Sequence, residues 1–83
     1  MLNVCDVEVR GGYRLWLRFS DGAAGEIDLV EQLTAPVFQP LRDPSIFAAV
    51  RVDPEIRTIA WPNGVDFAPE FLRSLLDDKA TAL

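Results

Sequence analysis

Residues 3–29 alternate between apolar and polar side chains, and glycines interrupt the alternation at two places. The runs Asn3–Val9 and Tyr13–Phe19 have the period of two that is typical of antiparallel strands. After the second glycine-containing loop, Ser20–Gly22, the alternation continues into a third run. Since short glycine loops join neighbouring antiparallel strands, the sequence predicts a three-strand meander with Tyr13–Phe19 in the middle.

The first loop decides the register of the first two strands. A two-residue Gly-Gly loop mixes apolar and polar side chains on each face, whereas the three-residue loop Arg10–Gly12 pairs Val9 with Tyr13 and keeps them sorted. The three-residue loop is therefore predicted, with Gly12 in the left-handed position of a G1 bulge. Cys5 falls in the apolar alternation, so it is interpreted as a small buried hydrophobic residue rather than a reactive thiol.

The outer face of the predicted sheet carries Arg14, Trp16 and Arg18. Such a basic–aromatic strip could bind single-stranded nucleic acid. In the predicted register, however, acidic residues flank Arg14 and Trp16: Glu8, Asp28, Asp6 and Glu26. Alternating charges remove the positive field that a phosphate needs, so a solvated charge ladder is favoured. Trp16 is either covered by the chain's own elements or exposed as an anchor for a partner protein.

The rest of the chain predicts short helical segments, a hairpin and a final helix. Asp43-Pro44 is typical of an N-cap followed by proline at the first helical position, and Val37–Leu41 suits a 3₁₀ segment. A four-residue loop, Pro54–Arg57, would join two strands that place Val52 opposite Ile59. The predicted fold is a two-layer α+β domain that comprises residues 1–83 as a single unit.

The last helix is predicted to begin at Pro69 and to carry one apolar stripe: Phe71, Leu72, Leu75 and Leu76. Asp77 and Asp78 oppose the helix dipole near its C-terminus, and we expect these two residues and the last residues of the chain to fray.

Composition excludes several kinds of site. The chain has one cysteine and no histidine, which argues against an internal disulfide, a zinc site or a Cys–His nucleophile. No metal motif or phosphate-binding loop is present in the sequence, so no metal and no cofactor are predicted. The net charge of −5 opposes non-specific binding to nucleic acids or anionic membranes. The first residues lack the pattern of a signal peptide, and the cytoplasm is the expected compartment.

The segment Trp61–Asp66 combines backbone constraint with polar side chains. Pro62 fixes one dihedral angle, Asn63 and Gly64 accept left-handed backbone, and Asp66 comes shortly before a helix start with free N–H groups. The Asp66 carboxylate is expected to accept hydrogen bonds from the turn or the helix start. Catalysis would need a second group within reach, and no catalytic residue is predicted.

Three segments together are similar to the small bacterial family called domain of unknown function 2442: Phe19–Gly22, Pro40–Phe47 and Thr58–Asp66. The resemblance covers nearly the whole chain, and the Trp-Pro-Asn-Gly-x-Asp segment is its most specific part. It implies a β-β-β-α-β-β-α domain. In some relatives a similar domain is fused to a helix-turn-helix domain, and genes of relatives often lie beside another small reading frame, as toxin–antitoxin genes do. The resemblance brings no catalytic residues, and a role in transcription would act through a partner.

Two classes of function remain open. The first is a non-catalytic protein-interaction module, the partner or antitoxin-like member of a two-gene system, which binds through Arg14, Trp16 and Arg18 or an exposed strand edge. The second is a small ligand-binding or enzymatic domain with a pocket near Trp61, Asn63 and Asp66. The small size of the chain favours the first class. A homodimer formed through a strand edge or a sheet face is compatible with both.

Overall fold

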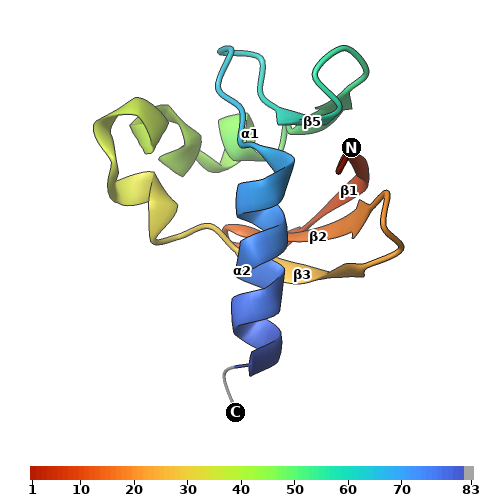
Figure 1. The fold of residues 1–83 in the computed structure, drawn as a ribbon. Helices are drawn as coiled ribbons and strands as arrows, with labels where there is room; N and C mark the ends of the chain where they lie inside the picture. The colour runs from red at the N-terminus through yellow and green to blue at the C-terminus, as the bar shows by residue number, and fades with distance from the viewer. Residues whose placement is uncertain (82–83) are drawn as a thin grey trace.

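The computed structural model describes residues 1–81 and shows a meander, a hairpin and a long C-terminal helix (Figure 1). In chain order the elements are β1 (Val4–Gly11), β2 (Arg14–Phe19), β3 (Ala24–Asp28), the 3₁₀ helices η1 (Gln32–Thr34) and η2 (Pro36–Arg42), α1 (Pro44–Phe47), β4 (Arg51–Asp53), β5 (Thr58–Ala60) and α2 (Pro69–Thr81). The first three strands form one antiparallel sheet in the order β1-β2-β3, and β4 pairs with β5. The predicted α+β class and order of elements are confirmed.

The pairing of β2 with β3 follows the predicted register along its whole length. It runs from Arg18 opposite Ala24 to Arg14 opposite Asp28. The loop between the two strands closes at Gly22, whose φ of 91° lies in the region that glycine adopts without a steric penalty. The single glycine in this loop therefore fixes the turn, and the turn fixes the register.

The predicted register of β1 and β2 is wrong by two residues. Val9 lies opposite Leu15 rather than Tyr13, and the turn has Gly12 and Tyr13 at its tip. The register shifts between Val9 and Gly11, where Arg10 is the extra residue of a β-bulge. The extra residue of the bulge brings the side chains of β1 back into step with those of β2. A turn with two residues at its tip therefore keeps apolar and polar side chains on separate faces. The apolar residues therefore keep the predicted face although their partners differ.

Contacts of Tyr13 with residues distant in the sequence explain why the observed register differs from the predicted one. The Tyr13 ring packs edge to face against Phe47 with 5.3 Å between the ring centroids, and its hydroxyl donates a hydrogen bond to the carbonyl of Arg42. The carbonyl of Tyr13 also accepts a hydrogen bond from the amide of Leu29. These interactions hold Tyr13 at the tip of the turn, so it does not pair with Val9.

Cys5 is exposed, contrary to the prediction that it is buried. A second register shift lies between Val4, opposite Phe19, and Asp6, opposite Arg18. Cys5 is therefore the extra residue of this irregularity and leaves the alternation, while Val4 is buried in the core. The sequence pattern alone does not reveal this irregularity.

The inner face of the meander packs against the other elements to form one core. Its buried side chains from the meander are Val4, Leu15, Leu17, Phe19 and Ile27, and those from the rest of the chain are Leu29, Leu33, Leu41, Phe47, Ile59, Trp61, Phe67 and Leu72. Helix α2 crosses the sheet on this side, as Figure 1 shows. A methyl group added to Gly25 of β3 would lie 2.5 Å from Leu76 Cδ1 of α2, so glycine permits the close approach.

Most predictions for the second half are confirmed. The Asp43 side chain caps α1 by accepting a hydrogen bond of 2.9 Å from the amide of Ser45. Val52 lies opposite Ile59, as predicted. Helix α2 includes Asp77 and Asp78 and continues to Thr81, and the last two residues of the predicted frayed end lie outside the described residues. The Arg73 guanidinium bonds to the Asp77 carboxylate one turn away and stabilises this part of the helix.

Candidate binding surfaces

The outer face of the meander is an exposed ladder of charges of both signs. Arg18 Nε donates a hydrogen bond of 2.6 Å to Asp6 Oδ2, and Arg14 Nη1 lies 3.3 Å from Glu26 Oε1. Because of the register shift, the acidic partners on β1 differ from those predicted. Arg14 and Arg18 remain about half exposed. Exposed ion pairs of this kind contribute about 0–1 kcal/mol each, so they define the surface more than they stabilise it.

Trp16 lies at the centre of this outer face and is half-buried. Its neighbours across the strands are Glu8 and Glu26, and the Arg10 guanidinium carbon lies 5.9 Å from its ring centroid. This distance permits a cation–π interaction. Helix α2 packs on the opposite face of the sheet, where Leu76 contacts Gly25. Of the two alternatives for Trp16, the described residues therefore favour an aromatic side chain that a partner can reach.

Trp61 belongs to the core. Its side chain is 1% exposed, and its indole Nε1 donates a hydrogen bond of 2.9 Å to the carbonyl of Phe47. The next residues form a compact turn in which Gly64 has a φ of 87° and the Asn63 Oδ1 accepts a hydrogen bond from the amide of Val65. Trp61 and Asn63 thus shape the backbone at the end of β5.

Asp66 is exposed and lies beyond this turn. It forms an isolated antiparallel bridge with Ala60, three residues before α2 begins at Pro69. Among residues 1–81, its carboxylate makes no hydrogen bond to the turn or to the helix start, and Asn63 caps the turn instead. The capping role predicted for Asp66 is therefore not found. The six predicted site residues lie in two places, with Arg14, Trp16 and Arg18 on the outer face and Trp61, Asn63 and Asp66 at the Trp-Pro-Asn-Gly turn.

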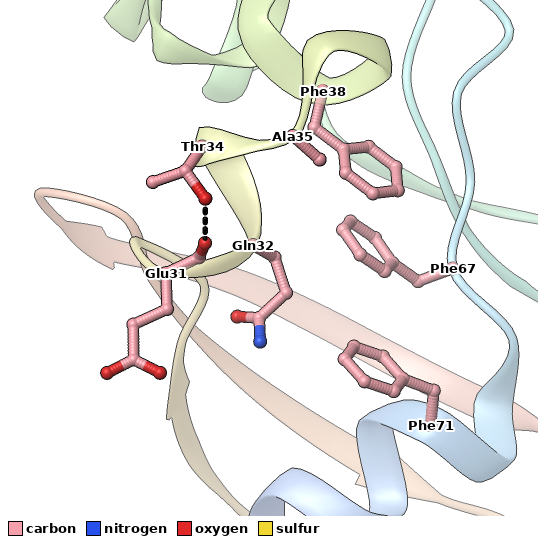
Figure 2. Close-up of a pocket in the computed structure, with 7 residues that line it drawn as sticks. All are labelled: Glu31, Gln32, Thr34, Ala35, Phe38, Phe67 and Phe71. Carbon is pink, nitrogen blue, oxygen red and sulfur yellow. Dashed lines mark hydrogen bonds between the residues drawn. The ribbon is translucent and has the colours of Figure 1, made fainter.

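A pocket that the sequence does not predict lies between η1, η2 and the start of α2. Its volume is about 370 Å³, and it is lined by Glu31, Gln32, Thr34, Ala35, Phe38, Phe67 and Phe71. The three phenyl rings form a column: the centroids of Phe38 and Phe67 are 4.6 Å apart, and those of Phe67 and Phe71 are 5.8 Å apart. Figure 2 shows the rings on one side of the pocket and the polar residues on the other. This volume is within the range of about 300–1,000 Å³ that is usual for ligand pockets.

One of the residues that line the pocket carries a buried hydrogen-bond acceptor without a partner. Gln32 Oε1 is buried and has no hydrogen-bond partner within the part of the chain that the structure describes. The neighbouring Thr34 hydroxyl is already used, since it donates a hydrogen bond of 2.9 Å to the Glu31 carbonyl. An unpaired buried carbonyl costs about 1–3 kcal/mol. The oxygen itself is buried and points away from the phenyl rings in Figure 2, so a molecule in the pocket would not contact it.

Three carboxylates whose pKa is lowered accept hydrogen bonds in loops or at the start of α1. The amide of Ala23, and then the Arg73 guanidinium, lower the pKa of Asp21 below its ordinary value. Hydrogen bonds from the hydroxyl and then the amide of Ser45 lower the pKa of Asp43. The amides of residues 55 and 56 do the same for the pKa of Asp53. These carboxylates stabilise loops and line neither the outer face nor the pocket.

Residues 1–81 contain no cluster of three or more Cys, Asp and Glu residues that could hold a metal ion. Nor does this part of the chain contain a helix long and apolar enough to cross a membrane. The structure thus offers two surfaces for function, the exposed face around Trp16 and the phenylalanine pocket.

The fold defines a small α+β domain with an exposed charged sheet face and an aromatic pocket. The chain belongs to the family described as Protein of unknown function (DUF2442), which matches residues 4–76. The fold is similar to the crystal structure of Putative DNA Binding Protein NE0471 from Nitrosomonas europaea ATCC 19718, with a TM-score of 0.84 and 25% sequence identity. The match covers 96% of this chain and 52% of that one, so the chain spans about half the length of the solved structure. No curated protein matches the sequence.

Proposed function

We propose that this domain is a non-catalytic protein-interaction module that binds its partner through the outer face of the meander. The observation that carries the proposal is the position of Trp16, a half-buried aromatic residue at the centre of an otherwise exposed sheet face, with Arg14 and Arg18 on either side. Tryptophan and arginine are the residue types most enriched at binding hot spots.

The charges on this face suit a protein partner better than a nucleic acid. Each arginine of β2 lies beside a carboxylate, Arg14 beside Glu26 and Arg18 beside Asp6, so the face has no continuous positive strip. A protein with a complementary pattern of charges can pair with both signs, which gives specificity and a fast encounter. The net charge of −5 favours a basic partner.

The proposal includes the role of partner or antitoxin-like member in a two-gene system, as the family resemblance implies, and keeps the cytoplasm as the expected compartment. The solved relative carries DNA binding in its name, and this chain matches about half of that protein. We assign no direct contact with DNA to this domain, because the ladder of the outer face alternates in sign. A link to DNA would run through a partner or another domain.

Affinity purification from the native host, followed by mass spectrometry, tests the proposal. Wild type should capture a specific protein that Trp16→Ala and Arg14→Glu do not capture, while both variants keep the wild-type circular dichroism spectrum. Ile56→Ala and Arg51→Glu are matched controls, since both residues are exposed in the β4–β5 hairpin. If the Trp16 and Arg14 variants capture the same proteins as wild type, the outer face is not the binding surface.

A ligand-binding domain is the second candidate, and the phenylalanine pocket is the observation that favours it. Phe67, at the centre of the ring column, directly follows Asp66, which places the pocket beside the segment that the sequence singled out. Asp66→Asn should weaken the binding of a ligand at this pocket without unfolding the protein. Loss of folding in this variant would instead make Asp66 a structural residue.

A further inference from the structure

We propose that the edge of β1 binds an extended segment of a partner protein as an additional strand, and that this segment carries a basic residue between two apolar ones. The inference deepens the proposed function and rests on it, because it assumes a protein partner and names how that partner binds. Strand β1 is an edge of the three-strand sheet, on the side opposite β3 (Figure 1). Addition of a strand to a sheet edge is a recurring mode of peptide recognition.

The hydrogen bonds around β2 show which residues of β1 face the edge. In an antiparallel ladder, successive residues direct their N–H and C=O groups alternately to the two sides of the strand. The amide of Leu29 bonds to the carbonyl of Tyr13 on the β3 side of β2. The amide of Phe19 likewise bonds to the carbonyl of Ala23. The odd-numbered residues of β2 therefore direct these groups toward β3, and its even-numbered residues direct them toward β1.

Two residues in the middle of β1 consequently direct their hydrogen-bonding groups away from the sheet. Val7 and Val9 lie opposite odd-numbered residues of β2, so they do not bond to that strand. Val4, opposite Phe19, confirms the direction, because its amide donates a hydrogen bond of 3.0 Å to the carbonyl of Arg57 in the β4–β5 hairpin. Within residues 1–81, no such bond reaches Val7 or Val9 from the hairpin or any other element. Their N–H and C=O groups are free to pair with an added strand.

The inner face of the β1 edge leaves an apolar side chain uncovered. Val9 is 41% exposed, although Leu15 opposite it is fully buried. Val7 is half-buried and packs against the core. On the other edge strand, β3, Ile27 points to the same face and is only 3% exposed, so that edge offers no comparable apolar contact. Apolar residues of an added strand beside Val7 and Val9 would extend the core, which favours the edge of β1.

The outer face of the same edge selects a basic residue between the apolar ones. Glu8 is the residue between the two valines, and it lies opposite Trp16 on the outer face. Its side chain is 62% exposed, and Arg10 Nη2 lies 3.5 Å from its Oε2, which is long for an ion pair with a hydrogen bond. A lysine or arginine of the added strand can therefore pair with this carboxylate. Such a residue would extend the row of Glu8, Trp16 and Glu26, so the edge continues the outer face.

The same charges argue against a second copy of this chain as the added strand. If β1 paired with β1 of the copy through both free valines, Val7 would lie opposite Val9 and Glu8 opposite Glu8. Pairing of Val7 with Val7 would place Asp6 opposite Glu8. Like charges directly opposite each other are destabilising. Pairing of Val9 with Val9 brings Glu8 opposite Arg10, but the bulge at Arg10 interrupts the edge there. A partner segment with a basic residue in the middle meets none of these obstacles.

The test uses two synthetic peptides as probes, acetyl-Thr-Val-Lys-Val-Thr-amide and the same peptide with glutamate in place of lysine. Each is added to isotope-labelled protein and followed by NMR. We expect saturable shifts of the Val7 and Val9 amides, with the lysine peptide bound at least about threefold more tightly than the glutamate peptide. High salt should reduce this difference. Absence of shifts at the two amides would overturn the site, and equal binding of the two peptides would overturn the charge preference.

N-methylated peptides separate strand addition from contacts made by side chains alone. Methyl groups on the two valine amides, which would pair with Val7 and Val9, should abolish binding. A methyl group on the lysine amide, which points away from β1, should leave the affinity within about twofold of the unmethylated peptide. Binding that tolerates the methylated valines would contradict an added strand and would leave the outer-face proposal intact.

Charge reversal in the protein tests the role of Glu8. Glu8→Lys should reverse the preference, so that the glutamate peptide binds more tightly than the lysine peptide. Glu55→Lys is the matched control, because Glu55 is exposed in the loop between β4 and β5, and it should leave the preference unchanged. A preference for lysine that persists in Glu8→Lys would contradict the selection by Glu8.

Two further measurements distinguish this inference from its alternatives. The peptides need no partner protein, so peptide binding in Trp16→Ala at wild-type strength, together with unchanged protein capture, would refute the outer-face proposal alone. Sedimentation velocity over a range of protein concentrations tests for self-association and should show none through this edge. A dimer whose formation shifts the Val7 and Val9 amides would identify a second copy as the occupant and would overturn the inference.

Discussion

The indole Nε1 of Trp61 donates a hydrogen bond of 2.9 Å to the backbone carbonyl of Phe47, and both side chains are buried in the core. This bond joins the end of β5 to α1. It explains why the Trp-Pro-Asn-Gly segment carries a tryptophan: the ring fills the core, and its N–H satisfies a carbonyl at the end of a helix of one turn.

Trp61→Phe should destabilise the fold by about 2–4 kcal/mol, because it leaves the Phe47 carbonyl without its donor and opens a cavity. Urea unfolding followed by circular dichroism measures this change. The matched control is Trp16→Phe on the outer face, which should change the free energy of unfolding by less than about 1 kcal/mol. Similar losses for the two variants would contradict the assignment of Trp61 to the core and Trp16 to the surface.

Gly25→Ala should lower the free energy of unfolding by about 1–2 kcal/mol, because the added methyl group would lie 2.5 Å from Leu76 Cδ1. The side chain of Leu76 is flexible, so part of the clash can relax. In the double variant with Leu76→Ala, the effect of the glycine substitution should fall to near zero. If Gly25→Ala costs the same with and without Leu76, α2 does not cross β3 at this point.

Acid should destabilise the protein through its turn carboxylates. The folded-state pKa values of Asp21, Asp43 and Asp53 are lowered by hydrogen bonds from loop amides, a serine hydroxyl and Arg73. The native state therefore binds fewer protons than the unfolded chain. Their contribution is complete above the unfolded pKa of about 3.9 and is lost as the pH falls through the lower folded values.

The free energy of unfolding should consequently be smaller at pH 3 than at pH 6, as urea titrations at the two pH values would show. In Asp53→Asn the decrease should be smaller than in wild type, since the amide oxygen can still accept hydrogen bonds from Glu55 and Ile56 but does not titrate. Stability that is constant or rises toward pH 3 would show that these carboxylates do not act in this way.

Whether the register of two strands could be predicted depended on the loop that joins them. The loop Ser20–Gly22 contains one glycine, and the three-residue turn that sorts the faces places this glycine at positive φ, as the structure has it. Gly11 and Gly12 both adopt positive φ, and a bulge at Arg10 makes a second solution available. The choice between these solutions is made by the contact of Tyr13 with Phe47, which the local pattern does not contain.

The two candidate binding surfaces also differ in how far the sequence predicts them. Arg14, Trp16 and Arg18 could be placed on one exposed face from the period of two alone, because a shift of register by two residues preserves the faces. The phenylalanine pocket could not be predicted, because Phe38 lies in a 3₁₀ segment around Pro40 and Phe71 in a helix that begins after Phe67. Their stacking depends on how η2 and α2 pack in three dimensions. The signal that the sequence offered for the pocket was the close spacing of prolines and an aromatic residue in Pro36–Pro40.

The dissociation constant of the captured partner, measured by calorimetry for wild type and for Trp16→Ala, tests the role of the outer face most directly. A hot-spot tryptophan contributes at least about 2 kcal/mol, so the variant should bind at least about 30-fold more weakly, while Ile56→Ala binds like wild type. A dissociation constant for Trp16→Ala within about threefold of the wild-type value would contradict the proposal that this face recognises the partner.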